Sequence, residues 1–234
     1  MRSLGLDPSL RSYGWCVYDS GATRPRDRRV ASGHEGTLSD VVPVARFMHF
    51  RSMVEDLLRR YSVDVVGLES PAYGGGPFSE THFGLMMFSL EAVFEVRKDC
   101  VLFDPVTLKS MATGKGDASK ADMQKAVQLD TMNPDPVQSD EADAYCVARH
   151  AARFMMLRRG EMQPDDLCKK EKTVFLERKR KKKVAGRGVV VKRTAHVFRE
   201  NSRFFTFSSV PAGDVKLPDK AMISPQLATW LDSP

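Results

Sequence analysis

The spacing of apolar and polar residues predicts that the chain begins with paired strands. Residues 3–7 (SLGLD) and 13–19 (YGWCVYD) are short apolar runs separated by a Pro-Ser-Leu-Arg turn, a pattern typical of two adjacent antiparallel strands. A third strand is expected around residues 29–36. Between residues 47 and 61 the apolar positions recur every three or four residues, so this segment is predicted to form an amphipathic helix.

Helices and strands are expected to alternate in the next part of the chain. The continuous apolar run at 63–69 is typical of a strand that is covered on both faces, and residues 80–97 return to helical spacing. Another strand is predicted at 100–104. Three helices should follow: a short one, one that starts at a Ser119–Asp122 capping box and runs to Leu129, and a long one capped by Ser139 that ends near Gly160. This order predicts an α/β fold, a mixed five-stranded sheet with helices on both faces.

Beyond residue 160 the periodicity fades and charge increases. We therefore expect a compact domain at 1–160 and a basic C-terminal extension at 161–234 that is partly flexible or binds DNA. Nine of the sixteen residues at 178–193 are Lys or Arg and none is acidic, whereas the whole chain carries a formal net charge of only +6. Such a segment favours a polyanionic partner, with a simply solvated charge run as the alternative.

Composition indicates where the protein is located and in what state its cysteines are. No apolar run approaches the roughly 18 residues of a membrane span, and the amino terminus lacks an apolar leader. The expectation is a cytoplasmic protein without a membrane partner. The four cysteines form no CxxC pair, which favours reduced thiols over a zinc site or a disulfide framework.

Four acidic residues stand where a metal site could form. Asp7 ends the first strand, Glu69 ends the fourth, and Asp140 and Asp143 lie three residues apart at the start of the last core helix. If the two strands are neighbours, their acids share one edge of the sheet, and the helix can bring its own pair to them. Carboxylates so close together repel unless divalent cations neutralise them. Oxygen ligands favour Mg²⁺ or Mn²⁺, and two such ions suit in-line attack at a phosphodiester. Taken singly, each acid could instead be a turn or helix-cap residue.

In this order the acids and their surroundings resemble the ribonuclease H-like superfamily, and within it the RuvC-type Holliday junction resolvases. The resemblance covers residues 1 to about 158. It rests on four segments: LGLDPSLRSYGWCVYD, VVGLES, FDPVTLKSMATGKGDASKADMQ and SDEADAYCVARHA. The added basic tail fits a version carried by a bacteriophage or another mobile element.

The resemblance implies a ribonuclease H-like fold and a metal-dependent endodeoxyribonuclease that nicks a four-way DNA junction symmetrically as a homodimer. Asp7, Glu69, Asp140 and Asp143 would be catalytic and would bind two Mg²⁺ ions, with Mn²⁺ as a substitute. Lys109 and Lys120 would contact the DNA backbone near the cleavage site, and Arg11 occupies a matching position in the opening hairpin. Lys115 joins the expected DNA-binding set because it lies between these lysines in a glycine-containing loop, where lysine and backbone amides suit phosphate contacts.

The sequence departs from the resolvase pattern at the position where an aromatic residue commonly wedges into the junction. That position, three residues after Glu69, is Ala72. Tyr73 or Phe78 is the expected substitute.

Two other functions compete with a junction nuclease. A DNA-binding scaffold would use its acids structurally and bind through the basic tail. An ATPase or sugar-kinase relative would need a second phosphate-binding hairpin with its own acid and glycine, and the sequence contains no such hairpin.

Overall fold

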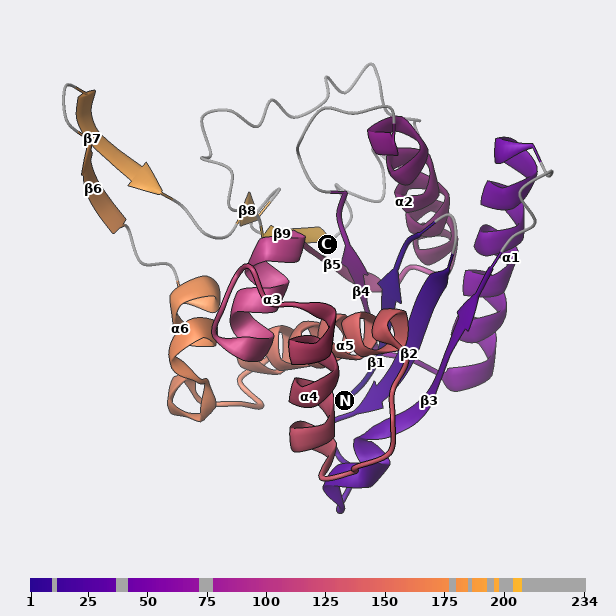
Figure 1. The fold of residues 1–234 in the computed structure, drawn as a ribbon, viewed down its shortest axis with the longest axis horizontal. Helices are drawn as coiled ribbons and strands as arrows, with labels where there is room; N and C mark the ends of the chain where they lie inside the picture. Colours follow the sequence, from indigo (N-terminus) through magenta and orange to yellow (C-terminus); the bar gives the residue numbers. More distant parts are fainter. Residues whose placement is uncertain are drawn as a thin grey trace.

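The computed structural model describes most of the chain (Figure 1). The described residues are 1–9, 12–36, 42–71 and 78–176, together with the backbone of 180–184, 187–192, 196–197 and 204–207. Arg11 and Tyr73 lie outside them. Phe78 is the first residue of a helix, but its side chain is not described.

A mixed β-sheet forms the centre of the molecule, as expected. Five strands come from the first half of the chain: β1 (Arg2–Asp7), β2 (Tyr13–Asp19), β3 (Arg29–Glu35), β4 (Val65–Glu69) and β5 (Asp99–Phe103). The order of the strands in the sheet is β3-β2-β1-β4-β5. Strand β2 is antiparallel to both of its neighbours, β1 and β3, whereas β4 and β5 are parallel to β1. Two strands of the C-terminal extension, β9 (Phe204–Phe207) and β8 (His196–Val197), continue the sheet beyond β5.

Helices cover both faces of the sheet, which confirms the expected layers (Figure 1). They are α1 (Pro43–Tyr61), α2 (Phe78–Glu95), α3 (Pro105–Thr113), α4 (Lys120–Thr131), α5 (Ser139–Arg158) and α6 (Lys169–Phe175). One apolar core lies between the sheet and the pair α1 and α2. A second core lies on the opposite face, where α5 packs on the sheet and α3, α4 and α6 surround it.

Side-chain caps fix where two of these helices begin. Asp104 caps α3, because its Oδ1 accepts a hydrogen bond from the Thr107 amide at 2.8 Å. The expected capping box of α4 is present, with reciprocal bonds between Ser119 and Asp122. Ser139 was expected to cap α5, and this was wrong. Ser139 is the first residue of that helix, and its hydroxyl contacts the Asp140 carboxylate at 3.1 Å instead.

Residues that pack on the core continue beyond position 160 to the end of α6. Leu167, Val174 and Phe175 belong to the core beneath α5. Glu171 is fully buried beside them and accepts hydrogen bonds from His150 Nδ1 (3.1 Å) and Arg153 Nε (2.7 Å). This buried ion-pair network attaches α6 to the middle of α5.

Within the described residues, no helix combines the length and the apolar character that a membrane span requires.

Glu171→Gln should lower the free energy of unfolding by about 3 kcal/mol at neutral pH, because it leaves the partly buried guanidinium groups of Arg149 and Arg153 without a counter-charge. Burial alone would raise the pKa of Glu171, but the bonds from His150 and Arg153 hold it well below its usual range. The stabilisation by Glu171 is therefore complete above the unfolded-state pKa near 4.3 and is lost as the pH falls below it. Urea unfolding at pH 7 and pH 3 checks this, with exposed Glu161→Gln as the control. Equal stability of wild type and Glu171→Gln at pH 7 would contradict the assignment.

Candidate active site

Two of the four predicted acids lie at the same edge of the sheet. Leu6 of β1 pairs in parallel with Leu68 of β4, so the next residues along the two strands, Asp7 and Glu69, end adjacent strands at the same level. Both side chains are only partly exposed. Burial raises the pKa of both acids, repulsion from Asp7 raises that of Glu69 further, and repulsion from Asp143 adds to both shifts. The protonation of each of these acids therefore depends on the charge of the others.

Helix α5 brings the other two acids to this edge because it lies unusually close to the sheet. A Cβ added to Gly5 of β1 would be 2.0 Å from the carbonyl oxygen of Ala144, and one added to Gly14 of β2 would be 2.2 Å from that of Asp140. Such distances are too short for any side chain. Glycine at these two positions therefore allows the first turns of α5, with Asp140 and Asp143, to lie against β1 and β2.

Asp140 is the acid of the cluster that is stabilised in its ionised form. Burial would raise its pKa, but hydrogen bonds from Ser12, Ser139 and Lys120 outweigh burial and lower it. The Lys120 ammonium lies 3.4 Å from Asp140 Oδ1 and 3.2 Å from Ser139 Oγ. Asp140 should therefore carry a full negative charge at neutral pH.

The pKa values of the other three acids are raised. Burial, followed by repulsion from Asp143 and Asp140, raises the pKa of Asp7 to about 8. Burial also raises the pKa of Asp143 to about 6 and that of Glu69 well above its usual value. Lys109 opposes all three shifts. The four acids thus repel one another across a shared, poorly solvated site.

The donor atoms of this cluster suit a hard divalent cation. All four side chains offer carboxylate oxygens, and Asp143 Oδ1 is buried without a hydrogen-bond partner among the described residues. An unsatisfied buried oxygen among repelling carboxylates fits a cation ligand. In the part of the chain that the structure describes, no group of three or more His, Cys, Asp or Glu side chains is already arranged to hold an ion. The four acids therefore stay a predicted ligand set.

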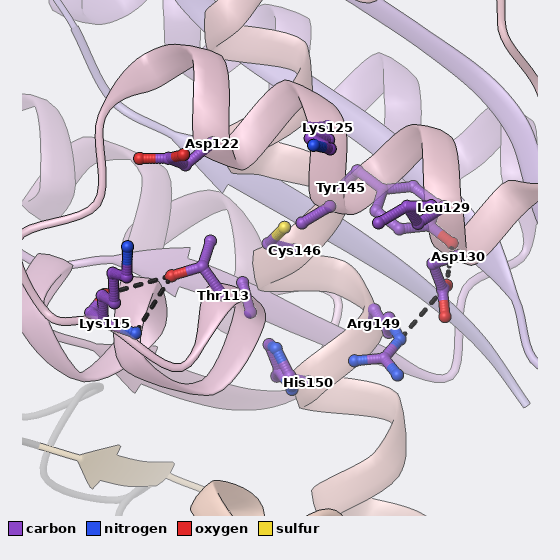
Figure 2. Close-up of a pocket in the computed structure, with 12 residues that line it drawn as sticks. Thr113, Lys115, Asp122, Lys125, Leu129, Asp130, Tyr145, Cys146, Arg149 and His150 are labelled. Carbon is purple, nitrogen blue, oxygen red and sulfur yellow. Dashed lines mark hydrogen bonds and ion pairs between the residues drawn. The ribbon is translucent and has the colours of Figure 1, made fainter.

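The three predicted DNA-binding lysines do not lie together. Lys109 on α3 and Lys120 at the start of α4 both act on the acid cluster. Lys115, in the loop between these helices, lines a cavity of about 470 Å³ whose lining includes none of the four acids. Figure 2 shows Lys115 beside Thr113, whose hydroxyl bonds to the Lys115 backbone.

Two residues at the site were missed by the sequence analysis. Ser12 bonds to Asp140, but a serine in a turn carries no distinguishing signal. Asp104 is nearly fully buried and acts on Glu69. It follows β5 directly, as a third acid at this end of the sheet, and this position could have identified it.

The sheet order, the acids at the ends of β1 and β4, and the acids in the first turns of α5 define a ribonuclease H-like nuclease fold. Residues 3–150 match the family model described as "Crossover junction endodeoxyribonuclease RuvC". This match covers more than half of the chain, so the chain belongs to the RuvC family of crossover junction endodeoxyribonucleases.

Individual relatives match about two thirds of the chain. The crossover junction endodeoxyribonuclease RuvC of Hyphomonas neptunium is 27% identical over 158 residues, which is 67% of this chain and 93% of the relative. That of Bordetella avium is 31% identical over 154 residues, 64% of this chain and 83% of the relative.

Solved structures share the fold. The structure of Thermus thermophilus RuvC superposes with a TM-score of 0.56 at 19% identity, covering 69% of this chain and 97% of that one. T. thermophilus RuvC in complex with a Holliday junction substrate gives a TM-score of 0.56 at 18% identity, covering 68% and 96%.

Gly14→Ala should displace the first turn of α5, because its methyl group would overlap the Asp140 carbonyl. We expect the free energy of unfolding to fall by about 3 kcal/mol, at the upper end of overpacking costs. Gly21→Ala is the control, since its Cβ would meet only the Asp19 side chain at 3.3 Å. Urea unfolding of both variants measures the difference, and two equally stable variants would show that α5 tolerates a larger separation from β2.

Proposed function

We propose that this chain resolves four-way DNA junctions by metal-dependent hydrolysis of phosphodiesters, with symmetrical nicks in two strands. Membership of the RuvC family makes it an endodeoxyribonuclease. The observation that carries the finer proposal is the cluster of Asp7, Glu69, Asp140 and Asp143 together with Lys109 and Lys120. The T. thermophilus relative crystallised with a Holliday junction adds support for the substrate class.

The cluster can accept a phosphodiester substrate only once its negative charge is neutralised. Four carboxylates alone would repel a DNA phosphate. Asp7, Glu69, Asp140 and Asp143 are the residues that would hold Mg²⁺, two ions per site with Mn²⁺ as a substitute, and such ions supply charge neutralisation and an activated water. Asp7 would hold metal together with the aspartates of α5, because its pKa responds to both of them.

The lysines of this chain would position the phosphate. Lys120 contacts Asp140 and Ser139 in the structure, and its side chain is 71% exposed, so it can turn towards a DNA strand. Lys109, on α3, attracts the negative charges of Glu69, Asp7 and Asp143 and so opposes the rise in their pKa values. Together they provide two cationic contacts that flank the acids, as expected for binding of a DNA backbone.

We further propose that the active form is a homodimer, because symmetrical nicking needs two sites. The adjacent helices α1 and α2 carry large apolar side chains that are about half exposed: Val44 (55%), Met48 (57%) and Phe83 (54%). The two helices pack on each other, for example through Phe47 and Phe88, whose ring centroids lie 5.4 Å apart. An exposed apolar surface of this kind is typical of an interface.

Wild-type protein with Mg²⁺ should introduce paired, symmetrical nicks into a synthetic four-way junction, and Asp7→Asn should slow them by at least about 10³-fold. Electrophoresis of end-labelled strands measures both the rate and the symmetry. Asp56→Asn, on the exposed face of α1, is the matched control and should cleave at the wild-type rate. An Asp7→Asn variant that cleaves normally would refute the catalytic role of Asp7.

Divalent cations should stabilise the folded protein, because they relieve the repulsion within the acid cluster. At 100 times the dissociation constant, one bound ion adds about 2.7 kcal/mol to the free energy of unfolding. We expect Mg²⁺ or Mn²⁺ to raise the melting temperature of wild type, and Asp143→Asn to abolish most of this shift. Melting curves with increasing Mn²⁺ test this without reference to cleavage. An identical shift in wild type and Asp143→Asn would place the ions elsewhere.

Met48→Glu combined with Phe83→Glu should convert the dimer to a monomer, since it puts four charges into the two-fold interface. Sedimentation equilibrium gives the mass, and exposed Glu91→Gln on α2 is a control that should stay dimeric. A wild-type mass of one chain, at concentrations where junctions are cleaved, would exclude this interface.

A further inference from the structure

Strands β6 (Arg180–Val184) and β7 (Arg187–Lys192) form a small antiparallel sheet of their own. In Figure 1 this ribbon extends away from the body beyond α6. Only residues 177–179 separate it from the packed chain, which ends just after the buried Phe175. The ribbon is therefore attached close to the folded domain.

The ribbon has an extreme charge composition. Six of its eleven strand residues are Lys or Arg, and none is acidic. Pairing places Arg180 opposite Lys192 and Lys182 opposite Val190. Because residues that pair directly share a face, Arg180, Lys182 and Lys192 occupy the same face of the ribbon.

This arrangement is unfavourable for the protein alone. Like charges directly opposite each other destabilise a strand pair, and an isolated two-stranded hairpin is at best marginally stable in water. Among the described strands, none pairs with the ribbon, since it is separate from the seven-stranded sheet. A polyanion lying against the cationic face would remove the repulsion and add stabilising contacts.

Duplex DNA is the polyanion that fits best. A two-stranded β-ribbon has the width that the major groove of B-form DNA admits, and phosphates line both sides of that groove. The match to the RuvC family model ends at residue 150, so the ribbon lies outside the part of the chain that the model covers. We propose that the β6–β7 ribbon binds a duplex arm of the DNA substrate through its phosphates, independently of base sequence. This inference rests on the proposed function only in taking the arm to belong to the cleaved junction.

The test is equilibrium binding of the full-length protein to linear duplexes without divalent cations, so that no cleavage occurs. The variant Arg180→Gln/Lys182→Gln/Lys192→Gln should bind at least about tenfold more weakly at roughly 0.1 M salt. The slope of log affinity against log salt should become shallower by about 2 to 3, roughly 0.9 for each phosphate that the variant no longer neutralises. Two duplexes of unrelated sequence should behave alike.

Two further variants separate a specific role from a general reduction of charge. Arg60→Gln/Lys125→Gln/Lys169→Gln removes the same number of positive charges, three, from exposed positions outside the ribbon and should bind nearly as wild type. Arg180→Lys/Lys182→Arg/Lys192→Arg keeps the charge and should restore binding. Unchanged affinity and slope in the glutamine variant, or equal weakening in the control, would overturn the proposal.

Failure of this proposal can be told apart from failure of the junction-resolving function. If the ribbon binds DNA but the domain does not resolve junctions, linear duplex binding will still depend on Arg180, Lys182 and Lys192 while four-way junctions stay intact with Mg²⁺. If only the ribbon proposal is wrong, junction cleavage will occur and the glutamine variant will bind duplexes like wild type.

Discussion

The close approach of α5 to the sheet is the constraint on which the site depends. Gly5 and Gly14 leave no room for a Cβ beneath this helix, because its backbone carbonyls lie directly over them. The helix can therefore lie low enough for Asp140 and Asp143 to share a site with Asp7, although the chain places them far apart in sequence. Further along α5, the buried pair of His150 and Glu171 attaches the helix to α6, so both the sheet and α6 hold it in position.

The same constraint creates an electrostatic cost. Close packing removes solvent from the acids, and desolvation is the largest contribution to the raised pKa values of Asp7, Glu69 and Asp143. Lys109 and Lys120 offset part of this repulsion. A cluster of carboxylates that is costly to keep charged is a site that gains most from binding a cation and, through it, a phosphate.

The sequence predicted those features that depend on local patterns. Apolar runs located β1, β2, β4 and β5, helical spacing located α1 and α2, and the Ser119–Asp122 capping box marked the start of α4. The cap at Ser139 was predicted wrongly because a serine just before an acidic helix start can serve either as a cap or as the first helical residue. Here Gln138 precedes the first helical residue, and the Ser139 hydroxyl contacts Asp140 and Lys120.

Other features depend on tertiary packing and could not be predicted locally. The chain after position 160 lacks periodicity, so neither the addition of β9 to the edge of β5 nor the burial of Glu171 could be read from it. The candidate acids could be predicted because they lie at strand ends and at the start of a helix. The contact of Ser12 with Asp140 could not, because it arises only once α5 lies on the sheet.

The most direct test of this account is to locate Mn²⁺ by anomalous diffraction in crystals of the protein. The account predicts anomalous peaks between the ends of β1 and β4 and the first turns of α5, within coordination distance of Asp7 and of at least one aspartate of α5. Peaks only at other positions, or none at the four acids at saturating Mn²⁺, would contradict it.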